Sequence, residues 1–369
     1  MTNSNPRVFG LDLMRAMAIC MVLCSHILWI YRPNDGLIKQ LFALFGFLGV
    51  EFFFVLSGFL IGKILYSIYI KDDYTIKSAF YFLRRRWYRT LPNYYLVLII
   101  NIIISTSLGY SIPKLGLYFI FLQNGFSKMA TFFPESWSLS VEEWAYLILP
   151  ISLLTFSFLF KPKNKNRFFL LIIVLLIMLF IGLKIGHQIN TKITTLDEWN
   201  ESVKAVMIYR LDAIFIGVLC AWISIHYQKY WAKFKFHSAL IGLLIMIFMY
   251  FGMGLLRIFP ETHPFVWNVI YLPLASLSIA FYMPFFSQLE TSIGIIKKPI
   301  EFISKISYSI YLFHYSVILQ LIMLIVDREN TSLFQFHMIT AFYLITLIVI
   351  SYVCYRFYEK PIMDFRDKN

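Results

Sequence analysis

The chain alternates long apolar runs with short polar segments. Ten of the runs are long enough to cross a bilayer as α-helices, because a span needs about 20 mostly apolar residues. A shorter apolar piece, Leu115–Leu122, is typical of a re-entrant or interfacial segment. We therefore predict an all-α integral membrane protein with about ten transmembrane helices in a single bundle, forming one domain over residues 1–369. The predicted spans are Leu11–Trp29, Leu41–Leu60, Leu91–Leu108, Trp137–Phe160, Phe168–Ile185, Ala205–His226, Ser238–Leu256, Val266–Phe286, Ser304–Val326 and His337–Tyr358.

The basic residues set the expected orientation of these spans. Of the 33 Lys and Arg residues, 22 fall on one side of the predicted bundle and 9 on the other. Basic loops mark the cytoplasmic side of a membrane protein, so both termini are expected to be cytoplasmic. The two remaining cations, Arg15 and Arg210, lie within spans.

Composition narrows the class of protein further. Hydrophobic residues make up 59% of the chain and charged residues 14%, with a mean hydropathy of +0.70, which indicates the lipid bilayer as its surroundings. The net charge of +13 arises from the basic loops, so it does not indicate a nucleic-acid partner. The four cysteines lie in apolar runs and are expected to be small buried hydrophobic residues. Their spacing predicts no metal site.

Ionisable side chains inside the first apolar run are the strongest functional signal, since such residues are costly in a membrane. Arg15 and His26 are eleven residues apart, close to three helical turns, and so share one face about 16 Å apart. Asp12 lies one turn before Arg15 and is expected to pair with it. The face therefore carries an anion-binding group at its inner end and a titratable base at its outer end.

Two carboxylates open the fourth predicted span, in the segment SWSLSVEEW. Glu142 and Glu143 are expected at about the same depth as His26, where a carboxylate can hold a histidine base in one tautomer. Adjacent helical residues point about 100° apart, so at most one glutamate can face His26. The alternative is an interhelical hydrogen bond that only stabilises the bundle.

Four arginines stand at the expected inner mouth of the third span, in the segment FLRRRWYRTLPNYY, with Pro92 suited to the first helical turn. Two of them, three residues apart, share a face, and guanidinium groups are the favoured phosphate binders. Together with Arg15 they predict a site for a phosphate-bearing ligand. The alternative is a set of charges that fixes topology and touches lipid headgroups. The arginines are Arg84, Arg85, Arg86 and Arg89.

The second span, GVEFFFVLSGFLIG, carries one further carboxylate. Glu51 near the bilayer midplane needs a partner. Ser57 and Gly58 are expected to allow close helix packing, and Ser57 lies too far from His26 to be activated by it.

Three more polar residues lie in later spans. Arg210 and Asp212 are expected either to pair with the glutamates of the fourth span or to bind a polar acceptor. His314 is most simply a core histidine that hydrogen-bonds to a neighbouring helix.

Taken together, these motifs resemble those of the acyltransferase-3 family of integral membrane acyltransferases, and the resemblance covers almost the whole chain. LDLMRAMAICMVLCSH is similar to the family's first-helix motif of an Arg and a later His. SWSLSVEEW and RRRWYR are similar to its Trp-Ser-Leu-Ser-Val-Glu-Glu segment and its Arg-x-x-Arg loop. The chain departs from the family at Glu51, often Asp, and at Lys360, where the family more usually has Arg.

The resemblance implies acetyl transfer from cytoplasmic acetyl-CoA to a hydroxyl of a carbohydrate or lipid-linked glycan, of the O-antigen (lipopolysaccharide), capsule or exopolysaccharide type, at the bacterial inner membrane. His26 would be the general base, oriented by Glu142 or Glu143, with a covalent acyl-His26 intermediate as the alternative. No permanently bound cofactor or metal is expected. The residues implied in binding the CoA are Arg15, Arg85, Arg86 and Arg89.

Other readings of the sequence differ in the reaction or the acceptor. Family members occur with or without a fused C-terminal hydrolase-like domain, and the chain stops after Asn369, which leaves open a partner protein for the final transfer. A transporter or flippase of a glycan precursor would also suit ten spans, although no internal repeat is visible. A family enzyme that acylates a small-molecule sugar is a further alternative. The acyl length, the acceptor hydroxyl and the oligomeric state are not set by the sequence.

Overall fold

The computed structural model describes residues 7–32, 36–71, 74–191, 193, 195–291 and 293–368, with the backbone alone at 37–40. This part of the chain consists of helices joined by turns and loops, with no strand, and ten of its segments are long and apolar enough to cross a membrane. The fold class predicted from the sequence is therefore confirmed.

The spanning segments differ from the predicted ones mainly at their ends. Several consist of two or three consecutive helical pieces, some of them π-helical (labelled η). They are α1 (Phe9–Ile27), α2 (Leu37–Ile70), α3 (Ile76–Ser107), α5 (Ser136–Phe160), α6 (Lys165–Asn190), η2 (Met207–Tyr209) with α8 (Leu211–His226), α10 (Lys235–Ile247) with η3 (Phe248–Gly252) and α11 (Met253–Leu255), η4 (Val266–Tyr271) with α12 (Leu272–Ala280) and α13 (Met283–Phe286), α14 (Gly294–Phe313) with η5 (His314–Leu319) and α15 (Gln320–Met323), and α16 (Leu333–Cys354) with η6 (Tyr355–Glu359) and α17 (Lys360–Lys368).

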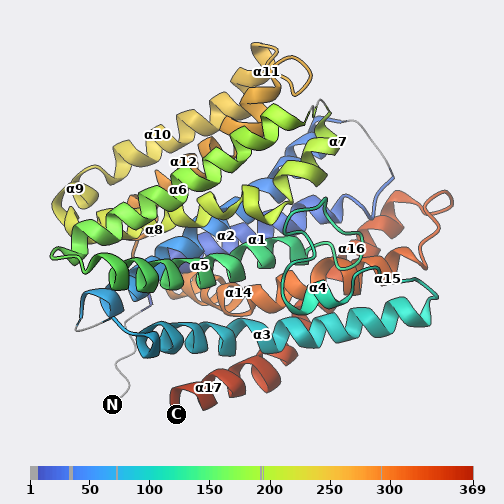
Figure 1. Ribbon diagram of the computed structural model, residues 1–369. Helices are drawn as coiled ribbons and strands as arrows, with labels where there is room; N and C mark the ends of the chain where they lie inside the picture. The colour runs from blue at the N-terminus through green and yellow to red at the C-terminus, as the bar shows by residue number, and fades with distance from the viewer. Residues whose placement is uncertain are drawn as a thin grey trace.

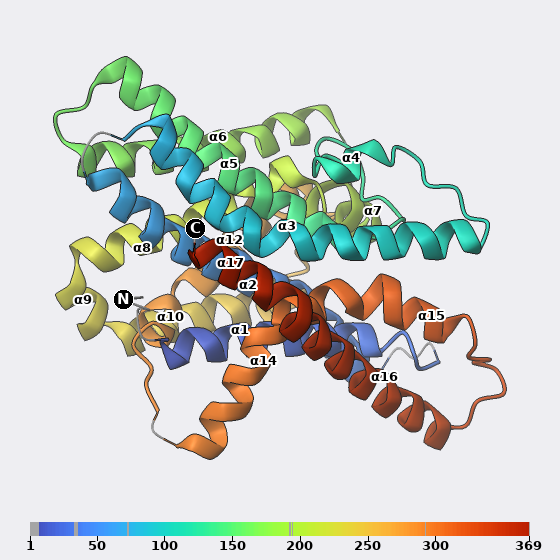
Figure 2. The ribbon, with the colours of Figure 1, turned by 90° about the horizontal axis from the view of Figure 1, so that it is seen from below.

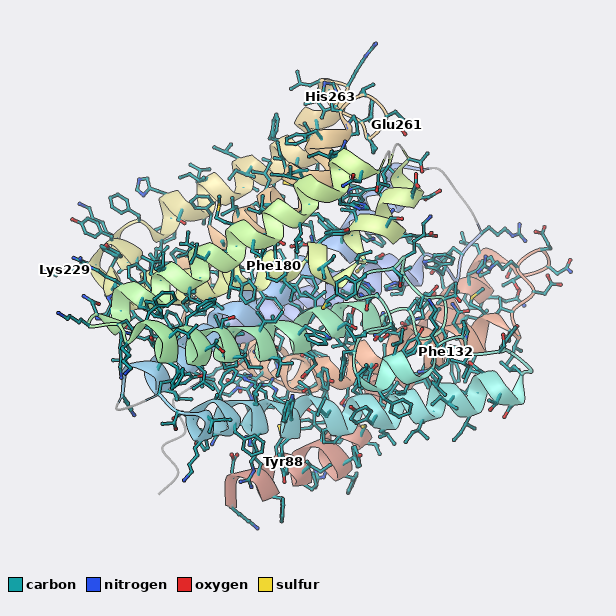
Figure 3. The ribbon with its side chains drawn as sticks, in the orientation of Figure 1. Tyr88, Phe132, Phe180, Lys229, Glu261 and His263 are labelled. Atoms are coloured by element: carbon teal, nitrogen blue, oxygen red, sulfur yellow. The ribbon has the colours of Figure 1, made fainter. Side chains whose placement is uncertain are left out.

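The long helices run roughly side by side, and the connections gather at the two ends of the bundle (Figure 1). The turn between α5 and α6 and the short helix α9 (Gln228–Lys233) lie at the left end, where Figure 3 also places Lys229. At the other end lie α4 (Gly116–Phe119), α7 (Leu196–Trp199), α15 and α11, with Glu261 and His263 in the loop after α11 (Figures 1 and 3). The basic α5–α6 and α8–α10 connections thus share one end, which we call the inner end after the charge rule.

Helix α2 lies at the centre of the bundle and packs against both α1 and α8. The contact with α8 depends on two glycines. A Cβ added to Gly58 would lie 2.0 Å from the Ile214 carbonyl oxygen, and one added to Gly217 would lie 2.2 Å from that of Val55. Since no side chain fits at either position, the two backbones touch there. The close approach that the sequence predicted at Gly58 is confirmed.

The outer surface of the bundle is apolar, as expected of helices that face lipid. Large side chains on α6 such as Leu175, Met178 and Leu179 are exposed, whereas Phe180 on the opposite face is buried (Figure 3). Such a surface would be unfavourable in water and is favourable in hydrocarbon.

Helix α3 begins fifteen residues before the predicted start at Leu91. Thr75 and Ser78 form a capping box there, and the helix continues through the four arginines without a break. Pro92 is therefore inside the helix rather than in its first turn, and the arginines lie on a helix rather than in a loop. The apolar-run criterion missed this segment because its charged residues exclude it from any hydrophobic window.

The far end of the chain covers this extension of α3. Helices α16, η6 and α17 form one continuous rod, and α17 packs against α3 (Figures 1 and 2). Arg366 of α17 donates to the Arg85 carbonyl oxygen at 3.1 Å.

Just past the middle of α3, two tyrosines hold the short helix α4. The hydroxyls of Tyr94 and Tyr95 donate to the carbonyl oxygens of Tyr118 and Phe119, each at 2.8 Å. The segment Leu115–Leu122 is thus a short packed turn and helix that does not span the membrane, as predicted.

Candidate functional site

A cavity of about 100 Å³ lies between five helices toward the inner end of α3 and collects most of the predicted donor-site residues. Three arginines and one glutamate converge in it, together with hydroxyl groups and an apolar wall. Its lining residues are Arg15 of α1, Val50, Phe53, Phe54, Leu56, Ser57 and Leu60 of α2, Arg86, Arg89 and Thr90 of α3, Ser138, Leu139, Glu142 and Tyr146 of α5, and Ser307, Tyr308 and Tyr311 of α14.

Arg15 is fixed in the cavity wall by its neighbours on α1 and α14. Its Nη1 donates to Asp12 Oδ1 at 3.3 Å and to Ser304 Oγ at 3.0 Å. Ser304 in turn donates to Asp12 at 2.6 Å. The expected partnership of Asp12 and Arg15 is confirmed.

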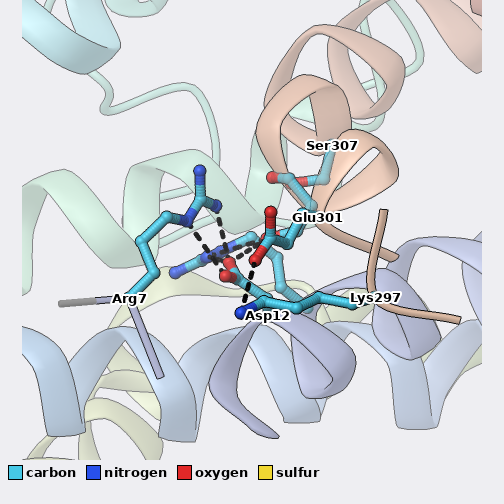
Figure 4. A network of polar contacts seen from close by, with 7 residues as sticks. Arg7, Asp12, Lys297, Glu301 and Ser307 are labelled. Atoms are coloured by element: carbon cyan, nitrogen blue, oxygen red, sulfur yellow. Dashed lines mark hydrogen bonds and ion pairs between the residues drawn. The ribbon is translucent and has the colours of Figure 1, made fainter. Parts of the chain in front are cut away.

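Asp12 also binds a second cation. Arg7 donates from Nε and Nη2 to the two carboxylate oxygens of Asp12 at 2.9 and 2.7 Å, and the ion pair of Lys297 and Glu301 lies beside this cluster (Figure 4). Because one carboxylate serves both Arg7 and Arg15, the cluster keeps a net positive charge, which favours an anion in the neighbouring cavity.

The Arg86 and Arg89 side chains both reach the cavity, which agrees with the predicted shared face of α3. Arg85 is not among the lining residues found in the described part of the chain. Instead it forms an ion pair with Asp367 of α17 at 3.4 Å. The implied role of Arg85 in CoA binding therefore has no support from the geometry.

Glu142 lies with the arginines. Its Oε2 accepts a hydrogen bond from the Tyr146 hydroxyl at 2.6 Å, and that hydroxyl lies 2.5 Å from Ser57 Oγ. The Arg86 guanidinium sits over the Tyr146 ring, 5.9 Å from its centroid. Ser57, interpreted from the sequence as a packing residue only, thus belongs to a Ser57–Tyr146–Glu142 hydrogen-bond chain in the cavity wall.

Glu143 points away from Glu142, as adjacent helical residues must. It is buried toward Thr90 of α3, and its Oε2 has no hydrogen-bond partner among the described residues.

His26 lies at the other end of α1 and contacts a histidine, not a glutamate. Its Nδ1 is 3.0 Å from the Val22 carbonyl oxygen and 3.2 Å from Nε2 of His314. The two imidazole rings meet edge to face with their centroids 4.8 Å apart, and Tyr315 covers His26 at 4.9 Å. The expected pairing of His26 with Glu142 or Glu143 is therefore not what the described residues form.

The expectation for His314 is confirmed, because this buried histidine does hydrogen-bond to a neighbouring helix. What the sequence could not supply is the identity of its partner, His26. Its Nδ1 lies 2.6 Å from the Tyr311 carbonyl oxygen, and its own carbonyl oxygen accepts from Tyr343 at 3.1 Å.

Glu135, directly before α5, is a buried carboxylate that the sequence reading missed. Its Oε1 accepts hydrogen bonds from the backbone N–H and the hydroxyl of Ser316 in η5, at 3.0 and 2.6 Å. Its Oε2 has no partner in the described structure. Burial raises the pKa of Glu135 to about 7, although the bonds from Ser316 oppose this rise. Its position between Pro134 and the conspicuous SWSLSVEEW segment was the only available signal.

The remaining predicted polar residues form two buried ion pairs. Glu51 pairs with Arg210 and also accepts from Ser276 Oγ at 2.9 Å. Asp212 pairs with Lys184 of α6 at 2.6 Å, a lysine at the end of the predicted span Phe168–Ile185. Arg210 and Asp212 therefore do not pair with Glu142 or Glu143. All four charges are buried and have a partner of opposite sign, as buried charges require.

Several known proteins are similar to this chain over most of its length. A family model described as "Acyltransferase domain" matches residues 8–356. The O-acetyltransferase OatA of Staphylococcus aureus strain NCTC 8325 is 26% identical over 383 residues, which cover 96% of this chain and 57% of that protein. OatA of strain COL matches to the same extent. The chain thus spans a little over half the length of these curated relatives. No solved structure matches it.

Proposed function

The chain belongs to the acyltransferase-3 family of multi-pass membrane acyltransferases, and we propose that it transfers an acetyl group from acetyl-CoA to a hydroxyl of an envelope carbohydrate. In this proposal it resides in the bacterial cytoplasmic membrane. Acetyl-CoA enters from the cytoplasm, and the acceptor, of the O-antigen, capsule or exopolysaccharide type, is modified at the outer face. The name O-acetyltransferase of its relatives supports the class of reaction.

One observation carries the proposal: three guanidinium groups converge on a single cavity, and the helix that supplies one of them also carries His26. Arg15, Arg86 and Arg89 supply fixed positive charge suited to the phosphates of CoA. His26 lies eleven residues beyond Arg15 on α1, about 16 Å along the helix. The extended phosphopantetheine arm of CoA is long enough to bridge such a separation and bring the thioester toward His26.

The proposed reaction needs one proton acceptor. His26 removes the proton of the acceptor hydroxyl while the hydroxyl oxygen attacks the thioester carbonyl carbon. The tetrahedral intermediate then breaks its carbon–sulfur bond, and the departing sulfur takes the proton from His26 as free CoA. The products are the acetyl ester and CoA, and His26 returns to its starting state.

Inside-out membrane vesicles would test this function directly. Vesicles would be prepared from a strain that lacks the gene, with and without the restored wild-type chain, and given acetyl-CoA labelled in the acetyl group. We expect base-labile label on the glycan fraction and release of free CoA only where the chain is present. Glycan carried into the vesicle without any label would support the transporter alternative and overturn the proposal.

The acceptor can be found in the same strains. Mass and NMR comparison of their envelope polysaccharides is expected to show an acetyl group that is lost with the gene and restored with it. Label on a small soluble sugar, with an unchanged polysaccharide, would instead identify a small-molecule acceptor.

A further inference from the structure

The contact between His26 and the buried His314 gives His314 a role. We infer that His314 is the positioning residue of His26: it accepts the Nδ1 proton of His26, fixes the orientation of that ring and leaves His26 Nε2 as the base. This inference rests on the proposed function. Within that function it gives His314 the orienting role that the sequence analysis expected of Glu142 or Glu143.

The backbone determines where the protons are on both rings. A carbonyl oxygen can only accept hydrogen bonds, so an imidazole nitrogen within 3.0 Å of one must carry a proton. His314 Nδ1 lies 2.6 Å from the Tyr311 carbonyl oxygen, and His26 Nδ1 lies 3.0 Å from that of Val22. In the neutral rings both Nε2 atoms are therefore unprotonated.

The contact between the rings agrees with this assignment. His314 Nε2 lies 3.2 Å from His26 Nδ1, so a lone pair faces an N–H. His26 shares that proton between Val22 and His314, and its Nε2 is left with no proton of its own. A base at Nε2 is what the removal of a hydroxyl proton requires.

His314 is held more firmly than His26. It is fully buried, whereas His26 is half-buried, and it begins the π-helix η5 directly after α14. Tyr343 donates to its carbonyl oxygen, and Glu135 binds both the N–H and the hydroxyl of Ser316, two residues later in the same turn. These contacts fix the acceptor atom of His314 independently of His26.

The arrangement has a consequence for charge during the reaction. When His26 Nε2 takes the hydroxyl proton, the ring becomes an imidazolium, and its Nδ1–H bond to the His314 lone pair strengthens. His314 thus stabilises the charged state without being charged itself. When the thiolate takes the proton back, the pair returns to its original tautomers.

Two substitutions at one position test the role of His314. His314→Leu removes the acceptor, whereas His314→Gln retains an acceptor oxygen on a side chain of similar reach. We expect the Leu variant to lower kcat about 100-fold with an unchanged KM for acetyl-CoA, and the Gln variant to stay within about tenfold of wild type. His226→Leu is the matched control, because His226 bonds Tyr66 at the inner end of the bundle.

The assay uses the purified full chain in nanodiscs, acetyl-CoA and the glycan fraction of the host as acceptor. If wild-type protein is inactive, the proposed function fails. If wild type is active and the Leu and Gln variants have equal kcat, the inference about His314 is overturned while the function stands.

A second measurement does not depend on activity and reads the tautomer in the wild-type protein. Nitrogen-15 NMR of imidazole-labelled wild-type protein reports which ring nitrogen is protonated, and the signals lost in His26→Ala belong to His26. We expect His26 to be protonated at Nδ1 and unprotonated at Nε2, which is the less common tautomer of free histidine. A His26 protonated at Nε2 overturns the inference.

Discussion

Arg15 and His26 lie on one continuous helix, α1, yet they belong to two separate polar clusters. Arg15 lines the arginine-rich cavity and bonds Asp12 and Ser304, whereas His26 bonds His314. Eleven residues of α1, about 16 Å, join the two clusters rigidly. A ligand that touched both would therefore be held at a fixed length, with its anionic end at Arg15 and its reactive end at His26.

The first prediction concerns His26. His26→Ala is expected to reduce acetyl transfer to background while acetyl-CoA still binds, because the arginine cavity is unchanged. Base-labile acetate on glycan and acetyl-CoA affinity, measured on the same membranes, check this. Full transfer by a well-expressed variant would remove His26 from the catalytic machinery.

The second prediction concerns the arginines of α3. Arg86→Ala and Arg89→Ala are each expected to raise the KM for acetyl-CoA tenfold or more, since a hydrogen bond to a charged group contributes about 1.5–3 kcal/mol. Arg84→Ala is the control, because Arg84 packs on Tyr88. Equal KM values in all three variants would leave these arginines as topology-setting charges only.

The third prediction concerns the buried pair of Glu51 and Arg210. Arg210→Met alone is expected to cost about 3–5 kcal/mol, because it leaves Glu51 charged and unpaired in an apolar site. The double variant Glu51→Leu with Arg210→Met is expected to recover most of that stability. Thermal unfolding in detergent measures both effects.

The activity of that double variant then assigns the role of the pair. If the double variant still transfers acetyl groups, the pair has a structural role only, as the geometry indicates. Loss of transfer in a stable double variant would instead place Arg210 in acceptor binding.

The fourth prediction is a pH dependence that originates at Glu135. Its folded pKa of about 7 lies above the value near 4.3 of an unfolded chain, so the folded state binds more protons between these pH values. Stability therefore falls as pH rises from about 4.5 to 7, by at most about 4 kcal/mol from this group.

Glu135→Gln isolates this contribution, because the amide keeps the Ser316 contacts and does not titrate. We expect the melting temperature of the variant, relative to that of wild type, to increase as pH rises from 5 to 8. The nearby tyrosines Tyr311, Tyr315 and Tyr343 stay in both proteins and cancel in the comparison. A difference that does not change with pH would contradict the raised pKa.

The fifth prediction tests the packing of α2 on α8. Gly58→Ala is expected to lower the melting temperature clearly, because its Cβ would meet the Ile214 carbonyl oxygen at 2.0 Å. Gly182→Ala on α6 is the matched control, since a Cβ there meets nothing within 4 Å and alanine favours a helix. Similar behaviour of the two variants would contradict the close backbone contact.

The sequence predicted the number of spans because each apolar run had to be buried in lipid or protein. It also predicted that Arg86 and Arg89 share a face, which follows from helical periodicity alone. It failed to identify which charged and polar residues of different helices contact one another. Two residues at the same depth in the membrane need not be neighbours within its plane. Glu142 and His26 are expected at matching depth, but α5 places Glu142 in the arginine cavity, away from His26.

The other errors have the same cause or a related one. Arg210 was assigned partners on the fourth span, but α2 and not α5 presents Glu51 to it. The start of α3 was misplaced because charged residues hid a helix that Thr75 caps. Glu135 was missed because nothing local shows that a carboxylate before a helix is buried by η5, far along the chain.

Helix α3 joins the two ends of the bundle mechanically. It carries Arg86 and Arg89 at the cavity, and about 8–14 Å of α-helix rise separate them from Tyr94 and Tyr95. Tyr94 and Tyr95 on this same helix bond the backbone of α4. Because a helix is rigid over so short a stretch, any movement of α3 that tightens the arginines on an anion also displaces α4.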